Sequence, residues 1–267
     1  MKVRDIIAAL DELFHFSTQD SWDNSGLIIG DPNMEAKGAL CAVDITESVV
    51  DEAIEMGYNV IVAHHPILFR PLKRLNNADA EQRLIVKAIK HDISLIAVHT
   101  PLDKTPEKGT SATVGAKIGL KEMRTMIPEQ QPYNEWGYGV VGKLDQKMSS
   151  KEFLKHVAKV VDCQAISHNG IEIDNIQTVC ICTGSSIEFA SKAEKLGADV
   201  YITSDIKYHQ MASSEKMLLM DIGHFESEKV STEIFLHELQ EKFPNFALRI
   251  SNDSENIIKY YINTDGK

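Results

Sequence analysis

Histidine and carboxylate residues follow three apolar runs of this 267-residue sequence, at the points where those runs end. Imidazole nitrogens and carboxylate oxygens together suit borderline or hard divalent cations such as zinc, manganese or iron. Because three separate runs end in such residues, the set is stronger evidence for a metal site than any single motif. The candidate ligands are His64, His65, Asp103, His224 and Glu228.

Each candidate also has an ordinary structural explanation. One histidine of the pair His64 and His65 could hydrogen-bond a backbone carbonyl while the other faces solvent. Asp103 could cap a turn or a helix. A helix that includes both His224 and Glu228 would put their side chains on one face. If that helix begins later, Glu228 becomes a first-turn acid that interacts with the helix dipole.

Two ions held by these donors would support hydrolysis. A carboxylate such as Asp103 can bridge two cations, which an imidazole cannot do. Water bound by ions about 3.5 to 4 Å apart loses a proton near neutral pH and becomes a nucleophile. We therefore predict metal-assisted hydrolysis as the reaction class. Mixed nitrogen and oxygen ligands accept several metals, so the identity of the ions stays open.

The elements that must position these residues alternate between apolar strands and helices. Near-continuous apolar strands joined by helical crossovers predict α/β architecture with a mostly parallel sheet covered on both faces. Ligands of such sheets bind beyond the carboxyl ends of the strands, where the candidate ligands lie. The predicted strands are 39–44, 59–63, 94–98, 179–183, 199–203 and 217–222, and the predicted helices include 1–14, 47–56, 81–90, 150–160 and 186–195.

The two halves of the chain repeat one strand-helix-glycine-strand plan. The segment that begins at Ala42 aligns without a gap with the segment that begins at Cys182, at a constant offset of 140 residues. We predict an internal repeat, with two α/β lobes, residues 1–125 and 126–267, that pack into one structural unit and face a central metal-binding cleft. Residues 121–134 show no clear periodicity and are expected to connect the lobes.

Composition and charge disfavour several classes of protein. The net charge of −11 disfavours general nucleic-acid binding. The helix predicted over residues 1–14 is amphipathic and is not a signal peptide, and no apolar run approaches the roughly 20 residues of a membrane span. We therefore predict a cytoplasmic protein without membrane association. Buried, reduced thiols are favoured over a disulfide or a thiolate metal site for Cys41, Cys163, Cys180 and Cys182.

An ordered set of motifs resembles the NIF-three-like family, whose bacterial members are named type 2 GTP cyclohydrolase I homologues. The match extends from the first helix to the helix after Glu228. The resemblance implies two related α/β lobes, a dinuclear metal site between them, a toroidal homohexamer, and the five candidate ligands above as metal ligands. The motifs are Trp22–Leu27 (WDNSGL), His64–Pro66 (HHP), His99–Asp103 (HTPLD), Ile202–Asp205 (ITSD) with His209, and Gly223–Glu228 (GHFESE).

The sequence departs from the family pattern at a few positions. Pro101 stands where the family often has asparagine, Ser204 stands where glycine is common, and the turn 183–186 is less rich in glycine than usual. None of these changes removes a ligand, but the changed turn could alter what binds beside the ions. The chain also lacks the extra domain that longer members carry between the two halves.

These observations lead us to predict a hydrolase that acts on a nucleotide-like or phosphorylated small molecule, with GTP ring opening as the family name suggests. Asp205 and His209 could support the ligands or transfer protons, or make plain hydrogen bonds. His99 is expected to orient its neighbours rather than bind a metal. Residues 22–24 could shape the rim of the pocket, or belong to a loop that packs on the sheet.

Two other functions stay open at this stage. The chain could form a metal-binding ring that regulates or scaffolds partners without turnover. DNA binding through the channel of such a ring is disfavoured by the acidic charge. Removal and restoration of metal during a screen of nucleotides and phosphoesters distinguishes the hydrolase from the non-catalytic ring.

Overall fold

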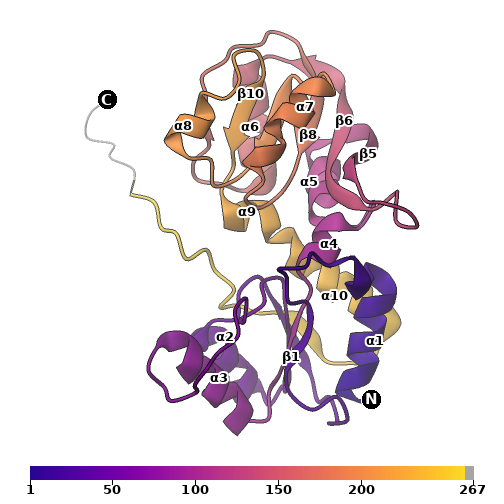
Figure 1. Ribbon diagram of the computed structural model, residues 1–267, viewed down its shortest axis with the longest axis vertical. Coiled ribbons are helices and arrows are strands. Elements are labelled where there is room, and N and C mark those ends of the chain that lie inside the picture. The colour runs from indigo at the N-terminus through magenta and orange to yellow at the C-terminus, as the bar shows by residue number, and fades with distance from the viewer. Residues whose placement is uncertain (262–267) are drawn as a thin grey trace. The chain divides into compact units, whose positions relative to one another are not determined.

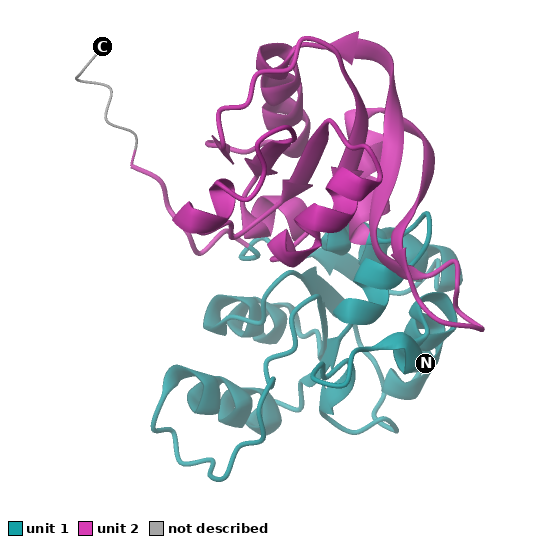
Figure 2. Cartoon of the chain, turned by 45° about the horizontal axis from the view of Figure 1, so that its top comes forward, with its two compact units in different colours: residues 1–109, 229–254 teal, residues 110–228, 255–267 magenta. Residues whose placement is uncertain are grey.

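The computed structural model describes residues 1–261 as a mixed α/β protein, which confirms the predicted fold class (Figure 1). The chain divides into two compact units and passes from one to the other three times (Figure 2). The sequence predicts a boundary between the two lobes after residue 125. The division in the structure differs from it, because a helix (Val230–Lys242) and a strand (Leu248–Ile250) from late in the chain belong to the first unit. Unit 1 comprises residues 1–109 and 229–254, and unit 2 comprises 110–228 and the segment that begins at residue 255.

Unit 1 contains a five-stranded sheet in the order β1-β4-β3-β2-β11. Its strands are parallel except β1, which pairs with β4 in the antiparallel sense. The strands are β1 (Gly26–Ile29), β2 (Ala39–Ala42), β3 (Val60–Ala63), β4 (Ser94–Ala97) and β11 (Leu248–Ile250). The helices are α1 (Val3–Phe14), η1 (Phe16–Thr18), α2 (Glu47–Met56), α3 (Ala80–Lys90), α4 (Thr100–Lys104) and α10 (Val230–Lys242).

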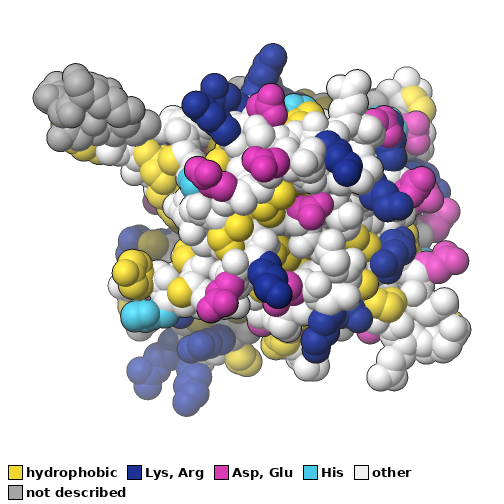
Figure 3. All heavy atoms as spheres, turned by 90° about the horizontal axis from the view of Figure 1, so that it is seen from above, with side chains coloured by type: hydrophobic (Ala, Val, Ile, Leu, Met, Phe, Trp, Pro, Cys, Tyr) yellow, Lys and Arg dark blue, Asp and Glu magenta, His cyan; other side chains and the backbone are white. Residues whose placement is uncertain are grey.

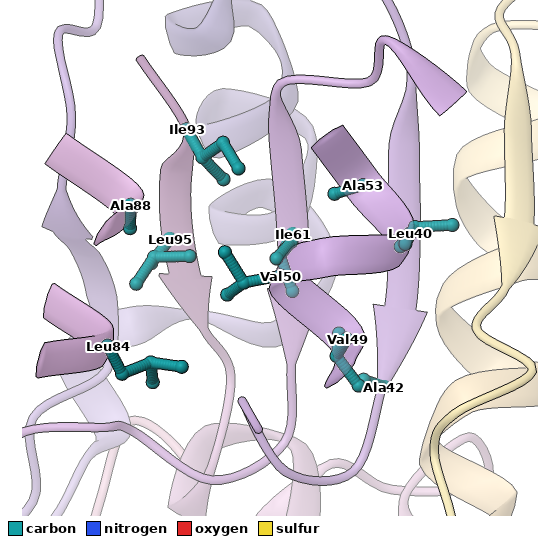
Figure 4. Packing of buried hydrophobic residues seen from close by; sticks show 10 residues of the cluster. All are labelled: Leu40, Ala42, Val49, Val50, Ala53, Ile61, Leu84, Ala88, Ile93 and Leu95. Carbon is teal, nitrogen blue, oxygen red and sulfur yellow. The ribbon is translucent and has the colours of Figure 1, made fainter. Parts of the chain in front are cut away.

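Helices cover both faces of the unit 1 sheet. Every residue of β2, β3 and β4 is buried, as expected for central parallel strands. Helices α2 and α3 lie on one side, and α1 and α10 lie on the other (Figure 1). Each fully buried large aliphatic side chain contributes about 1.5 to 3 kcal/mol, so this core holds the strand ends in place. The core on the α2 and α3 side includes Leu40, Val50, Ala53, Ile61, Leu84, Ala88 and Leu95 (Figure 4).

Unit 2 contains a six-stranded mixed sheet in the order β5-β6-β8-β9-β10-β7. Strands β8, β9 and β10 are parallel to one another, and the other pairings are antiparallel. The strands are β5 (Leu120–Pro128), β6 (Gly137–Met148), β7 (Ser167–His168), β8 (Ile176–Ile181), β9 (Val200–Thr203) and β10 (Leu218–Asp221). The helices are α5 (Thr110–Ile118), α6 (Ser150–Val161), η2 (Ile187–Phe189), α7 (Ala190–Lys195), α8 (Tyr208–Met211) and α9 (His224–Glu228).

The expectation that residues 121–134 only connect two lobes is wrong for most of the segment. Residues up to Pro128 belong to β5, which forms an antiparallel hairpin with β6. The strand lies at the edge of the sheet, and its register shifts between Lys121 and Arg124. This irregularity breaks the alternation of apolar and polar side chains that identifies a half-exposed strand from sequence.

The structure reproduces the predicted repeat in detail. Ala39 pairs with Val60 in unit 1, and Val179 pairs with Val200 in unit 2, so the strand register is the same at the 140-residue offset. The glycine that ends the intervening helical segment has a left-handed φ of 68° in unit 1 and 76° in unit 2. The two segments therefore share both their hydrogen-bond register and their chain reversal.

The cysteines form no disulfide within the described chain, and Cys41, Cys180 and Cys182 are buried, as predicted. Burial raises the pKa of the Cys41 thiol to about 12. Burial also raises the pKa of Cys180 to about 12, although the charge of Arg124 opposes the shift. Such thiols stay protonated at neutral pH, which makes them poor metal ligands.

The exposed side chains include both signs of charge and several large apolar groups. On the face drawn in Figure 3, acidic and basic side chains are interspersed among uncharged ones. Among residues 1–261, no helix combines the length and the apolar character that crossing a membrane requires.

Candidate metal centre

In unit 1, two adjacent histidines follow the end of β3. His64 is fully buried, His65 is partly buried, and their ring centroids lie 5.0 Å apart. Asp103 lies on α4, with its Oδ1 3.6 Å from Nε2 of His64. The structure thus brings together the three unit 1 residues that the sequence nominated, and Asp103 lies in the first turn of α4, whose N-cap is His99.

Hydrogen bonds fix which ring nitrogen of each histidine carries the proton. Nδ1 of His64 lies 3.0 Å from the carbonyl oxygen of Val98. Because a carbonyl only accepts, Nδ1 donates, and Nε2 of the neutral ring keeps its lone pair. Nδ1 of His65 lies 2.8 Å from Oδ1 of Asp44 in the same manner. Metal-binding histidines are typically oriented by such oxygen partners on the nitrogen that does not bind the metal.

His99 completes a group of three imidazoles in unit 1. Its ring centroid lies 5.2 Å from that of His64 and 5.5 Å from that of His65. Each of the three rings offers a nitrogen that lies within 4.8 Å of those of the other two, a spacing that could hold a metal ion. His99 therefore has the position of a possible ligand, beyond the orienting role expected from the sequence.

Asp23 orients His99 and the start of α4. Its Oδ1 lies 2.9 Å from Nδ1 of His99, and its Oδ2 accepts hydrogen bonds from Ser25 and from the backbone and hydroxyl of Thr100. Burial raises the pKa of Asp23, but the hydrogen bonds from His99 and Thr100 outweigh burial and hold it well below its ordinary value. Asp23 is therefore a carboxylate that supports the histidine group.

In unit 2, a single short helix carries both candidate ligands. Helix α9 begins at His224 and ends at Glu228, so the two side chains share one face. Nε2 of His224 lies 2.9 Å from Oε2 of Glu228, and Nδ1 lies 2.7 Å from Oδ2 of Asp205. This geometry contradicts the alternative in which the helix begins after His224. It also repeats the pattern of unit 1, with an oxygen on Nδ1.

The charges around His224 change its proton affinity. Burial lowers the pKa of the ring, but the hydrogen bonds and negative charges of Glu228 and Asp205 outweigh burial and raise it to about 9. The same carboxylates would favour a divalent cation at Nε2, where binding displaces the proton.

The turn 183–186 makes room for Glu228. A Cβ atom at Gly184 would collide with Oε1 of Glu228, and Gly184 has a left-handed φ of 69°. The turn is held by hydroxyl groups, since Ser227 accepts from the backbone of Gly184 at 3.0 Å and Thr203 donates to its carbonyl at 2.9 Å. The turn contains less glycine than the family pattern, but it keeps glycine where the carboxylate requires it.

The two residues predicted to support proton transfer lie in different surroundings. Asp205 contacts His224 and has a left-handed φ of 57°, which is uncommon outside glycine. His209 is exposed on α8, where its ring lies edge-on to Tyr208 at 5.2 Å. An orienting role fits Asp205, and a proton-transfer role for His209 stays a prediction.

The three imidazoles of unit 1 are spaced to hold a divalent metal ion, and unit 2 offers two donors of the same kinds, His224 and Glu228. The rings of His64, His65 and His224 each have an oxygen partner on Nδ1, and carboxylates lie beside Nε2 of His64 and His224. Imidazole and carboxylate donors of this kind suit zinc, iron or manganese. Sequence reasoning missed Asp44 as an orienting group, although Asp44 follows an apolar run as the ligands do.

Comparison with known proteins points to one family. The profile of the Duf34/NIF3 (NGG1p interacting factor 3) family matches residues 1–256. A protein of Clostridium perfringens named GTP cyclohydrolase 1 type 2 homolog is 33% identical over 231 residues, which cover 85% of this chain and 87% of the relative. A protein of Clostridium acetobutylicum with the same name is 30% identical over 242 residues, which cover 90% of each.

Solved structures show the same fold. The Staphylococcus aureus hypothetical protein SA1388 superimposes with a TM-score of 0.91 at 31% identity, covering 98% of this chain and 99% of that one. A Bacillus cereus protein related to NIF3 superimposes with a TM-score of 0.90 at 23% identity, covering 98% and 99%. The resemblance inferred from the motifs is therefore confirmed across nearly the whole chain.

Proposed function

Because this chain belongs to the Duf34/NIF3 family, we propose that it is a metal-dependent hydrolase of a nucleotide-like or phosphorylated small molecule. Two divalent ions, of zinc, iron or manganese, would be held by His64, His65, Asp103, His224 and Glu228. The name GTP cyclohydrolase 1 type 2 homolog, carried by relatives of 30% identity or more, supports the substrate class.

The observation that carries the proposal is the shared orientation of three histidines. His64, His65 and His224 each have an oxygen partner on Nδ1 at 2.7 to 3.0 Å. These partners, a backbone carbonyl and two carboxylates, leave Nε2 of each ring for a cation, which at His224 would displace the proton that the ring carries below about pH 9. A histidine that serves only to fill space has no need of this arrangement.

The residues of the centre divide the work of hydrolysis. Bound divalent ions supply Lewis acidity, which lowers the pKa of water and polarises the attacked group. Asp103 and Glu228 offset the positive charge of the ions, and Asp44 and Asp205 hold the rings of His65 and His224. Asp23 holds Nδ1 of His99 and so fixes the orientation of that ring and of its Nε2. His209 could carry a proton to or from the substrate.

Metal analysis combined with a substrate screen tests the proposal. The chain is stripped with a chelator, reloaded with zinc, iron or manganese, and assayed with nucleotides and phosphoesters. We expect two ions per chain and turnover that returns with metal. The double change His64→Ala and His224→Ala should abolish both, whereas His91→Ala, which changes an exposed histidine, should abolish neither. Turnover that survives the double change contradicts the mechanism, and two ions without turnover favour a regulatory or scaffold ring.

The proposal also includes an assembly and a location. From family membership we propose a homohexameric ring that acts in the cytoplasm. Light scattering during size-exclusion chromatography measures the assembly, and the mass of a single chain at micromolar concentration would contradict it.

A further inference from the structure

Two exposed aromatic rings flank the histidine group of unit 1. Trp22 is 56% exposed and Phe69 is 48% exposed. Their ring centroids lie 5.7 Å and 5.5 Å from that of His99, and both rings meet the imidazole edge-on. Large aromatic side chains beside a cluster of polar groups are typical of ligand sites, because the rings offer apolar contact area that is otherwise left in water.

The loop that carries Trp22 is fixed by hydrogen bonds although the ring itself is exposed. Nδ2 of Asn24 donates to the carbonyl of Leu68 at 2.7 Å, which links this loop to the loop of Phe69. Lys104, only 2% exposed, donates to Oδ1 of Asp20 at 2.5 Å. Together with the bonds of Asp23, these contacts hold the loop that carries Trp22 before any ligand binds, which lowers the entropy cost of binding.

A group of positive charges continues from Phe69. Arg70, Lys73 and Arg74 are exposed in the loop between β3 and α3, and residues 66–78 contain no acidic residue. This is a local exception in a chain whose net charge is −11. Arginine and lysine side chains bind phosphate by charge-assisted hydrogen bonds. An aromatic contact and a phosphate contact are thus adjacent in one loop of unit 1.

We propose that this surface recognises a nucleotide, with the base stacked on Trp22 and Phe69 and the phosphate bound by Arg70, Lys73 and Arg74. The inference rests on the proposed function and deepens it, since it assigns substrate specificity to residues outside the metal ligands. An aromatic ring stacks on the face of any planar base, and each stacked base changes affinity by roughly tenfold or more. Bound in this way, a nucleotide lies beside the three imidazoles.

Tryptophan fluorescence of the full metal-loaded chain gives the first test. The chain has two tryptophans, so Trp136→Phe leaves Trp22 as the only reporter. We expect guanosine 5′-monophosphate to quench the fluorescence saturably, and guanosine to do so with about tenfold weaker affinity because it lacks the phosphate contact. Ribose 5-phosphate should leave the fluorescence unchanged, because it has no base to stack.

Leucine variants remove each ring and keep apolar volume. Trp22→Leu and Phe69→Leu should each weaken guanosine 5′-monophosphate about tenfold in calorimetry and leave ribose 5-phosphate unchanged. Trp22→Phe, which keeps a ring, should bind nearly as tightly as the parent. Leu75→Ala changes another exposed apolar side chain of the same loop, 50% exposed, and should have no effect.

Charge variants test the phosphate contact. The triple change Arg70→Gln, Lys73→Gln and Arg74→Gln should weaken guanosine 5′-monophosphate and ribose 5-phosphate about tenfold or more and leave guanosine unchanged. Equal binding of the nucleotide by Trp22→Leu and the parent would refute the surface.

Metal content measured in the same samples separates the two proposals. A chain that holds its ions but binds no nucleotide keeps the metal centre and overturns this inference. A chain that binds the nucleotide through Trp22 but holds no ion supports the recognition surface and overturns the metal hydrolase.

Discussion

The two units place an equivalent short helix after an equivalent strand, yet they put their chemistry at different positions. Val98 donates to the last residue of β3 and Ile222 donates to the last residue of β9, so α4 and α9 begin at matching points of the two sheets. Both helices have five residues. Lys104 therefore corresponds to Glu228, so one position holds a buried structural cation in unit 1 and a candidate metal ligand in unit 2.

The residues that follow equivalent strands also differ between the two units. By the 140-residue offset, His65 corresponds to Asp205, which orients His224. Asp44, which orients His65, corresponds to Gly184, which leaves space for Glu228. Unit 1 places its imidazoles at strand ends and one candidate ligand, Asp103, on α4, whereas unit 2 places both of its candidate ligands on α9 and an orienting carboxylate at the strand end. Equivalent backbone positions thus place side chains at the same points of the two units, and the residue type determines whether a side chain is a candidate metal ligand or orients one.

The largest expected effect tests the structural role of Lys104. Lys104→Ala leaves Asp20 and the carbonyl of Thr18 without their buried cation. We expect the free energy of unfolding of the metal-free chain to fall by about 3 to 5 kcal/mol, because the change leaves a cavity where a fully buried side chain packed and leaves the partly exposed Asp20 without its cation. Urea unfolding measures it, and Lys259→Ala, which breaks an exposed pair, should cost less than about 1 kcal/mol. If the two variants lose the same free energy of unfolding, Lys104 is not a structural cation, and its contrast with the candidate ligand Glu228 is wrong.

A second prediction concerns the space that unit 2 keeps for Glu228. Gly184→Ala should lower the free energy of unfolding by about 2 to 4 kcal/mol. The added methyl group would collide with the carboxylate of Glu228, and alanine is also disfavoured at the left-handed φ of this position. Gly197→Ala is a matched control, since Gly197 has a similar φ of 76° but open space around its Cβ position, and it should cost only about 1 to 2 kcal/mol. Metal titration should show weaker binding in Gly184→Ala alone. Similar behaviour of the two variants would show that Gly184 serves the backbone only.

The orienting carboxylates of the two units should matter equally. Asp44→Asn and Asp205→Asn each keep the size of the side chain but weaken its hold on a histidine. We expect each change to lower metal affinity about 10- to 100-fold, as measured by competition with a chromogenic chelator. Asp145→Asn changes an exposed carboxylate and should leave the affinity unchanged. An effect confined to one unit would mean that only that unit binds metal through an oriented histidine.

The smallest expected effect is a pH dependence caused by His224 in the metal-free chain. Its pKa of about 9 in the folded chain exceeds the ordinary 6.5, so the protonated ring stabilises the fold. The contribution is complete below about pH 6.5 and is lost as the pH rises through 9. We expect it to be about 1 to 2 kcal/mol, since solvent screens a partly exposed ring. Urea unfolding between pH 6 and 10 should show this loss in the parent and not in His224→Gln.

The sequence by itself determined the elements of the repeat and the residues that carry the chemistry. The strands and helices around Ala42 and Cys182 lie where the apolar runs and the glycine stops predicted them, because burial of central parallel strands leaves a local signal. The ligand candidates were visible for the same reason, since they follow those strands directly. Helix α9 was left open, because whether it began at His224 depended on contacts that no local pattern records.

Only the tertiary structure decided which groups meet. His99 meets Asp23 across 76 residues, and Lys104 meets Asp20 across 84. Strand β11 joins the first sheet by pairing with β2, although it comes from the end of the chain. Partners so far apart in sequence are selected by the packing of whole elements, which determines the distances between side chains. Local apolar patterns determine only where each element begins and which face it buries.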